Sequence, residues 1–154
     1  MDFFLFDTTL GQMALACEDE AITQLYLPDA PIPRIASQET PLLARGREQL
    51  LEYLAGTRTR FDLPLSPHGT PFQQRVWAAL REIPYGQTRS YRDIALTVDC
   101  PRGFRAVGMA NNRNPIPIFI PCHRVVGADG SLVGYAGGLD LKRRLLALEG
   151  VSLG

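Results

Sequence analysis

Cysteine and histidine are scarce in this chain, with three cysteines and two histidines among 154 residues. The cysteines lie far apart at Cys17, Cys100 and Cys122, their number is odd, and none belongs to a Cys-x-x-Cys pair. This pattern argues against both a disulfide framework and a zinc cluster. We therefore predict no metal site and no cofactor, and a reducing compartment, the cytoplasm, as the location.

Long hydrophobic runs are also missing, and we expect no signal peptide in this sequence. No stretch approaches the roughly 20 apolar residues that a membrane span requires. The first residues include Asp2 and Asp7 and only a four-residue apolar run, unlike the basic and long apolar regions of a signal peptide. Because 45% of the residues are hydrophobic, the chain can bury a core, and we expect a globular protein without a membrane partner.

Lysine is almost absent, since Lys142 is the one lysine among 16 basic residues. Arginine is better suited than lysine to bidentate contacts with phosphate. The formal net charge is zero, yet residues 1–69 hold 5 basic and 10 acidic residues, whereas residues 70–154 hold 11 basic and 6 acidic residues. The basic half could face nucleic acid, or the two halves could dock on each other, and composition leaves both interpretations open.

The first part of the chain has the pattern of a small sheet followed by a helix. Runs that favour β-structure at residues 3–6 and 22–27, with turn residues at 9–11 and 18–20, predict a small antiparallel sheet. Apolar residues at helical spacing predict one helix over residues 41–55.

A linker is expected in the segment 62–69, which contains two prolines and a glycine. We therefore place an N-terminal lobe at residues 1–66 and a DNA-binding and active-site lobe at residues 67–154. The predicted fold class is α+β, with a small antiparallel sheet in the first lobe and a mostly helical second lobe.

Three helices are predicted in the second lobe, from Thr70 to Pro84, over 91–98 and over about 102–111. A short turn joins the last two, and the later one carries Arg102 and Arg105, which fits a helix-turn-helix. A plain pair of packed helices would fit as well. Five arginines against two aspartates between residues 86 and 113 favour the DNA-binding interpretation.

A cysteine and a histidine are adjacent in the proline-rich segment 114–126. Pro121 should end any strand pairing just before Cys122, because proline cannot serve a central strand. The thiol would then lie at a chain bend, with His123 and Arg124 as groups that favour the reactive thiolate. A buried structural cysteine beside a backbone-bound histidine is the alternative.

The segment Pro-Cys-His-Arg-Val at 121–125 resembles the active-site signature of the O6-alkylguanine-DNA alkyltransferases, also called methylated-DNA-protein-cysteine methyltransferases. Further segments resemble this family in order and spacing, namely 105–108, 114–117, 134–138 and 142–150. The resemblance is strong from about residue 70 to residue 150 and weak before that.

The resemblance implies direct-reversal DNA repair. The protein would move an alkyl group from O6-alkylguanine in double-stranded DNA to its own cysteine, once and irreversibly, after base flipping. O4-alkylthymine stays open as a second substrate. The helix-turn-helix would use the minor groove without reading sequence, and the protein would act as a monomer.

Catalytic roles follow from the same resemblance. Cys122 matches the alkyl acceptor, and His123 matches the base that takes its proton through a water. Glu149 matches the carboxylate that orients the imidazole, and Asn114 matches the asparagine that tethers the turn before the active-site segment. From residue type alone, Glu149 could instead be a solvated helix end.

Substrate and DNA contacts are implied as well. Tyr91 matches the tyrosine that acts on the flipped nucleotide, and Arg105 matches the arginine that enters the duplex in place of the base. The loop that lines the guanine pocket corresponds to Tyr135, Ala136 and Gly137. Further DNA contacts are expected at Arg102, Gly108 and Arg113. From residue type alone, Tyr91 could be a core residue and Arg105 only a phosphate contact.

The sequence departs from the family pattern at three points. Phe104 is bulkier than the small residue usually found before the arginine that enters the duplex. Ala136 replaces a serine of some members, which removes one possible hydrogen bond to the substrate. The zinc site of some members has no counterpart, because Cys17 and His68 alone cannot form it.

Two other functions are compatible with parts of the pattern. An alkyltransferase-like protein would sense lesions without repairing them, but such proteins replace the acceptor cysteine and Cys122 is present. A cysteine hydrolase built on Cys122, His123 and Glu149 would show multiple turnovers on an ester or a peptide.

Overall fold

The computed structural model describes residues 1–152. The chain divides into two compact units, with His68 as the last residue of the first and Gly69 as the first residue of the second. The sequence analysis placed this division between residues 66 and 67. Among residues 1–152, no helix has the length and apolar character needed to cross a membrane.

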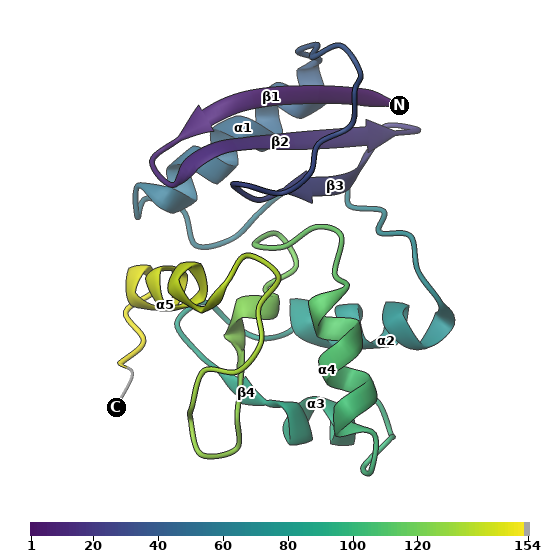
Figure 1. Ribbon diagram of the computed structural model, residues 1–154, viewed down its shortest axis with the longest axis vertical. Helices are drawn as coiled ribbons and strands as arrows, with labels where there is room; N and C mark the ends of the chain where they lie inside the picture. Colours follow the sequence, from purple (N-terminus) through teal and green to yellow (C-terminus); the bar gives the residue numbers. More distant parts are fainter. Residues whose placement is uncertain (153–154) are drawn as a thin grey trace. The chain divides into compact units, whose positions relative to one another are not determined.

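The first unit is built on a three-stranded antiparallel sheet (Figure 1). Its strands are β1 (Asp2–Thr8), β2 (Gly11–Glu18) and β3 (Ala21–Tyr26), with β2 in the centre. The turn between β2 and β3 has positive φ at both central residues, 50° at Asp19 and 64° at Glu20, as in type I′ hairpins. Both turns of the sheet lie where the sequence analysis predicted them.

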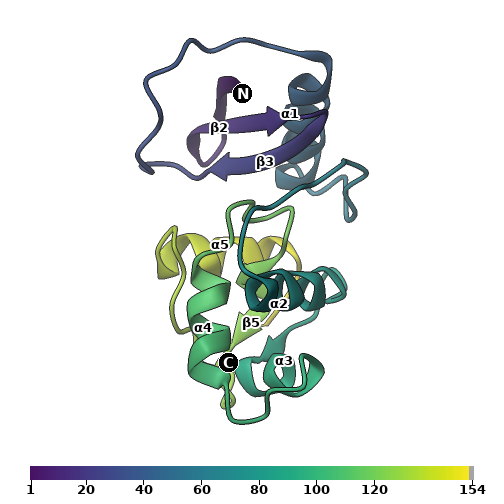
Figure 2. The same ribbon diagram turned by 90° about the vertical axis from the view of Figure 1, so that its right-hand side faces the viewer.

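Helix α1 (Pro41–Leu54) packs against one face of this sheet (Figure 2). Thr40 caps the helix, because its hydroxyl accepts a hydrogen bond from the Leu43 N–H at 3.2 Å. At Gly46 an added Cβ would lie 2.7 Å from Leu15 Cδ1 of β2. The missing side chain at Gly46 therefore allows the helix to approach the sheet closely.

The second unit is mostly helical. Helix α2 (Pro71–Arg81) begins with a capping box at Thr70. Its Trp77 is 2% exposed and donates its indole N–H to the carbonyl of Ala110 at 2.8 Å. This hydrogen bond joins α2 to α4 (Phe104–Asn112), whose buried residues are Val107, Ala110 and Asn111.

Helices α3 (Tyr91–Thr97) and α4 form the expected helix-turn-helix (Figure 1). Ser90 caps α3 by accepting a hydrogen bond from the Asp93 N–H at 3.0 Å. Ile94 and Val107, one from each helix, are buried in the core of the unit.

Helix α4 begins at Phe104, later than the sequence analysis predicted. Arg102 lies in the preceding turn and not in the helix. The turn closes through a hydrogen bond from the Gly103 N–H to the Cys100 carbonyl at 2.8 Å, and a Cβ at Gly103 would overlap the Cys100 sulfur. This tight turn uses residues that helical spacing alone assigned to α4.

The remaining elements of the second unit are a short helix that begins at Cys122, a two-stranded parallel sheet and a last helix. The short 3-10 helix η1 (Cys122–Arg124) leads into β5 (Val125–Val126), which pairs in parallel with β4 (Arg89–Ser90). Helix α5 (Leu139–Leu148) is the last element of the unit. The predicted α+β class, with a small antiparallel sheet in one part and mostly helices in the other, is confirmed.

Candidate active site

Cys122 is the first residue of η1 and is 3% exposed. Pro121, the residue before it, has φ −79° and ψ 65° and follows a turn over Ile118 and Phe119. The Arg124 N–H donates to the Pro121 carbonyl at 3.0 Å, which closes the turn. The thiol therefore lies at a chain bend, as the position of Pro121 predicted.

Asn114 holds the segment that leads to Cys122. Its Nδ2 donates to the Ile120 carbonyl at 2.7 Å, and its Oδ1 accepts from the Ile116 N–H at 2.9 Å. Between them Ile118 adopts a φ of 74°, which is rare for a branched residue. The Asn114 side chain also interacts with the Cys122 thiol and favours the thiolate. The structure thus brings Asn114 and Cys122 together.

Glu149 forms hydrogen bonds with three residues from two parts of the chain. The Nε2 atom of the fully buried His123 lies 2.6 Å from Glu149 Oε2. Arg124 binds both carboxylate oxygens, with Nε 2.8 Å from Oε1 and Nη2 3.0 Å from Oε2. The Gly86 N–H donates to Oε1 at 3.0 Å. Because Glu149 is only 6% exposed, it is not a solvated helix end.

Burial and hydrogen bonding set the charges in this cluster. Burial raises the pKa of Cys122 to about 11, although hydrogen bonds and the Lys142 ammonium lower it in part. Burial is the largest cause that lowers the pKa of His123, and the charges of Arg124 and Lys142 lower it further, so it stays below its usual value although Glu149 raises it. Burial would raise the pKa of Glu149, but hydrogen bonds to its carboxylate outweigh burial and lower this pKa to about 2. At neutral pH the site therefore holds a thiol, a neutral imidazole and a carboxylate.

Tyr91 and Lys142 hold the loop that precedes Tyr135. The Tyr91 hydroxyl donates to the Val133 carbonyl at 2.7 Å. Lys142 Nζ donates to the carbonyls of Val133 at 3.0 Å and Gly134 at 3.2 Å, and it lies 5.9 Å from the centroid of the Tyr91 ring. Burial lowers the pKa of Lys142 to about 8. Helices α3 and α5 thus fix this loop together.

The residues expected to line a guanine pocket differ in how far they are buried. Tyr135 is 8% exposed, and its hydroxyl interacts with the Cys122 thiol and favours the thiolate. Ala136 is exposed and Gly137 is half-buried. Tyr135 therefore belongs to the cluster around Cys122, whereas Ala136 lies at the surface.

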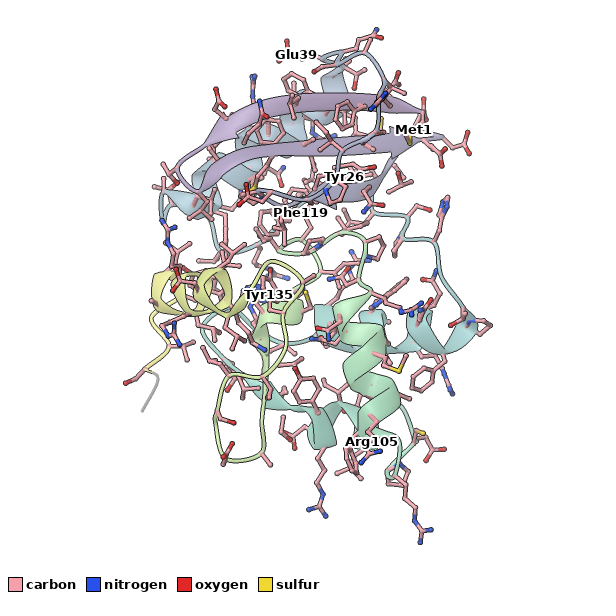
Figure 3. All side chains as sticks on the ribbon, viewed as in Figure 1. Met1, Tyr26, Glu39, Arg105, Phe119 and Tyr135 are labelled. Atoms are coloured by element: carbon pink, nitrogen blue, oxygen red, sulfur yellow. The ribbon has the colours of Figure 1, made fainter. Side chains whose placement is uncertain are left out.

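The residues expected to contact DNA are on and beside α4. Arg102, Arg105 and Arg113 are all exposed. Figure 3 shows Arg105 at the end of α4 that is farther from Tyr135. At Gly108 an added Cβ would be 3.9 Å from the ring of Tyr91, an ordinary contact, so packing inside the unit does not require glycine there. The three arginine side chains are thus exposed, unlike the buried thiol of Cys122.

Two residues of the cluster have positions that the sequence analysis did not predict. Lys142 was not recognised as a site residue, although it is the single lysine of the chain and falls in the apolar face of α5 with Leu141 and Leu145. Arg124 was expected to favour the thiolate. Its guanidinium instead binds Glu149, and the cation that lowers the pKa of Cys122 is Lys142.

All three cysteines are free thiols. Within residues 1–152, no group of three or more histidine, cysteine, aspartate or glutamate side chains is arranged to hold a metal ion. Cys122 is the cysteine that adjoins a buried histidine–carboxylate pair.

Two domain families together match nearly the whole chain. Residues 3–67 match the ribonuclease-like domain of 6-O-methylguanine DNA methyltransferase, and residues 71–151 match the DNA-binding domain of the same family.

Relatives from bacteria and archaea match over nearly their full length. The constitutive methylated-DNA–protein-cysteine methyltransferase of Bacillus subtilis is 49% identical over 95% of this chain and 93% of its own length. The methylated-DNA–protein-cysteine methyltransferase of Methanosarcina acetivorans is 44% identical over 97% of this chain and 99% of its own length.

Solved structures agree with these matches. Mycobacterium tuberculosis OGT in complex with DNA superposes with a TM-score of 0.90 and 44% identity, over 97% of this chain and 92% of that protein. Schizosaccharomyces pombe Atl1, in complex with damaged DNA containing O6-carboxymethylguanine, matches 55% of this chain with a TM-score of 0.50 and 31% identity. The matches over both halves, at identities well above 30% for nearly complete chains, show that this protein belongs to the 6-O-methylguanine DNA methyltransferase family.

Proposed function

We propose that this protein repairs DNA by moving an alkyl group from O6 of guanine in double-stranded DNA to the thiol of Cys122. The observation that carries this proposal is the position of the Cys122 thiol at a tight turn. The next residue, His123, is buried and forms a hydrogen bond with the Glu149 carboxylate. Family membership supports it, since the relatives are named as methyltransferases of methylated DNA and one of them is solved with DNA.

The target nucleotide has to leave the duplex before it can react. Guanine O6 lies on the base edge inside the stack, so a thiolate cannot line up behind the alkyl carbon until the base is flipped out. Unstacking costs a few kcal/mol, and a side chain that fills the gap offsets part of this cost. Arg105 is the proposed filler, because it is exposed on α4 of the helix-turn-helix. Tyr91 is proposed to act on the flipped nucleotide.

The reaction itself is a displacement at the alkyl carbon. The Cys122 thiol gives its proton to His123, through a water, and the sulfur forms a bond to the alkyl carbon as the bond from that carbon to guanine O6 breaks. The electron pair goes to the guanine, which takes a proton from water and stays in the DNA as an unmodified base. The imidazolium of His123 returns its proton to water, so the protons balance. Because burial raises the pKa of Cys122 to about 11, proton removal has to accompany the attack.

Glu149 serves this step as an anchor and not as the final proton acceptor. Its pKa is lowered to about 2, so it stays ionised at neutral pH. Through the 2.6 Å contact to Nε2, it holds the imidazole of His123 in one orientation and stabilises the imidazolium that forms. Asn114 is proposed to keep the thiol in place through its contacts with the segment before Cys122.

The exposed arginines around α4 are proposed to bind the DNA backbone. Arg102, Arg105 and Arg113 carry fixed positive charge, and Gly108 offers a place where the backbone of α4 can approach DNA closely. Tyr135, Ala136 and Gly137 are proposed to line the pocket for the flipped base. The contacts made by the arginines would go mainly to phosphate, so they would recognise the shape of the DNA and not its sequence.

The thioether product is the end of the reaction. No other assigned residue can break a carbon–sulfur bond at neutral pH, so each chain acts once. Every residue assigned a role belongs to the second unit of one chain, so we propose a monomer as the active form. Cys122 must stay reduced to react, which makes the reducing cytoplasm the proposed location.

Mass spectrometry of the reacted protein tests this proposal. After incubation with a duplex that contains O6-methylguanine, the intact protein should gain the mass of one CH2 group. Peptide analysis should find this mass on the peptide that contains Cys122, and not on those with Cys17 or Cys100. Cys122→Ser should still bind the duplex and transfer nothing, because a serine hydroxyl is far less nucleophilic than a thiol.

The alternatives give different results in the same experiment. A lesion sensor would bind the duplex and gain no mass. A cysteine hydrolase would turn over an ester or a peptide many times without permanent modification. More than one lesion repaired per chain, or a label on another cysteine, would overturn the proposal.

A further inference from the structure

Asn111 joins the DNA-binding helix to the backbone of Cys122. It is the penultimate residue of α4 and is 1% exposed. Its Nδ2 donates a hydrogen bond to the Cys122 carbonyl at 3.3 Å. The sequence analysis gave this residue no role.

This hydrogen bond is not needed to satisfy the Cys122 carbonyl. The same carbonyl already accepts a hydrogen bond from the Val125 N–H, which closes the 3-10 turn. On the other side of the amide, Asn111 Oδ1 is buried without a hydrogen-bond partner among residues 1–152. A buried acceptor without a partner costs folding free energy, and an apolar side chain of similar shape would avoid that cost. Folding stability therefore does not explain an asparagine at this position.

We propose that Asn111 is a positioning residue for alkyl transfer, which holds the Cys122 peptide so that the thiol is aligned for attack. This inference rests on the proposed function. The Cys122 carbonyl belongs to the peptide plane that joins Cys122 to His123. Restraining that plane fixes ψ of Cys122, and with it the relative directions of the thiol and the imidazole.

The location of Asn111 on α4 gives this restraint a second consequence. Arg105, which we propose to enter the duplex, is on the same helix as Asn111. The helix is a rigid element, so the Cys122 turn is held relative to the residues that contact DNA. Displacement reactions are sensitive to such alignment, and a misplacement of about 1 Å can slow a reaction roughly 100-fold.

The substitution Asn111→Leu tests the proposal, because leucine has a side chain of the same branched shape without the amide. At saturating O6-methylguanine duplex, the rate constant for alkyl transfer should fall by about tenfold or more. The rate with free O6-benzylguanine should fall by the same factor. Asn111 is proposed to act on the alkyl-transfer step, which both substrates share, and not on base flipping, which only the duplex requires. The duplex concentration that gives half the maximal rate should not change. The midpoint of thermal unfolding should stay the same or rise.

Asn112→Leu is the matched control, because the same residue type at the next position of α4 is exposed. It should react with O6-benzylguanine at the wild-type rate. If Asn111→Leu does not fold, Asn111→Ala replaces it, since alanine removes the Nδ2 donor without adding volume or a buried charge. The same slow transfer is expected for Asn111→Ala.

Two results would overturn the inference. One is transfer within about twofold of wild type by the folded variant. The other is a loss of rate that appears only together with a lower unfolding midpoint, which would mark Asn111 as structural. The proposed function is tested separately by the mass gained on Cys122 in the wild-type protein, so failure of one does not imply failure of the other.

Discussion

Arg124 binds Glu149 through two parallel hydrogen bonds, Nε to Oε1 at 2.8 Å and Nη2 to Oε2 at 3.0 Å. Both side chains are almost completely buried. The guanidinium compensates the carboxylate charge, so the pair is neutral as a unit. His123 is then a neutral imidazole beside a neutral pair, which is the state a base needs before it accepts a proton.

Replacing Glu149 should cost stability and remove a pH dependence. Glu149→Gln leaves the Arg124 guanidinium buried without its counter-charge, and we expect a loss of about 3 kcal/mol in the free energy of unfolding. Because the folded state lowers the pKa of Glu149 to about 2, its stabilisation is complete above the unfolded pKa near 4.5 and is lost as the pH falls toward 2. Urea unfolding from pH 7 to pH 2.5 measures both effects. A variant as stable as wild type at pH 7 would contradict the assignment.

Arg105 should matter for duplex DNA and not for a free base. Arg105→Ala should slow repair of an O6-methylguanine duplex by at least tenfold, whereas the reaction with free O6-benzylguanine should be almost unchanged, because only the duplex requires base flipping. Arg143→Ala, an exposed arginine on α5, is the control and should affect neither substrate. Equal losses on both substrates would show that Arg105 acts on folding or chemistry and not on flipping.

Binding to unmodified duplex should weaken steeply as salt increases. The logarithm of the association constant should decrease by about 0.9 per neutralised phosphate for each unit in the logarithm of salt concentration. Arg102→Ala and Arg113→Ala should each reduce this slope by about 1. Fluorescence anisotropy at several salt concentrations gives the slope. Binding that does not depend on salt would exclude a phosphate-binding surface.

Lys142 should speed the reaction below pH 8 and lose this effect above it. Its ammonium lowers the pKa of the Cys122 thiol, so Lys142→Met should slow the reaction with O6-benzylguanine at pH 7. The wild-type lysine, with a pKa lowered to about 8, loses its own charge above that pH, and the two rates should then converge. A constant ratio from pH 6 to pH 10 would show that Lys142 acts only by holding the Val133–Gly134 carbonyls.

Local patterns were sufficient to predict much of the fold. Thr70 and Pro71 marked the start of α2, because an N-cap followed by proline acts within one turn of chain. The turn at Asp19 and Glu20 was found in the same way. The central strand β2 was not identified separately, because its Met-Ala-Leu-Ala sequence has no β preference and forms a strand only through its two neighbours.

The chemistry of the site could be predicted only in part. The Pro121–Cys122–His123 sequence located the proposed nucleophile, since those residues are adjacent in the chain. Contacts between residues far apart in sequence, such as Gly86 with Glu149 or Lys142 with Val133, arise from tertiary packing and have no local signal. The resemblance supplied Glu149, but it supplied neither the partner of Arg124 nor the place of Lys142.

The short parallel pairing of β4 with β5 sets the spacing between the Cys122 turn and the start of α3 through backbone hydrogen bonds. Arg89 pairs with Val125 and Ser90 with Val126, so the residue just before Tyr91 and the residues just after the Cys122 turn share one backbone ladder. The spacing between the nucleophile and the start of α3 is therefore a property of main-chain hydrogen bonds. Changes in the loop around Tyr135 could then widen or narrow the pocket for different alkyl groups while the spacing from Cys122 to Tyr91 stays constant.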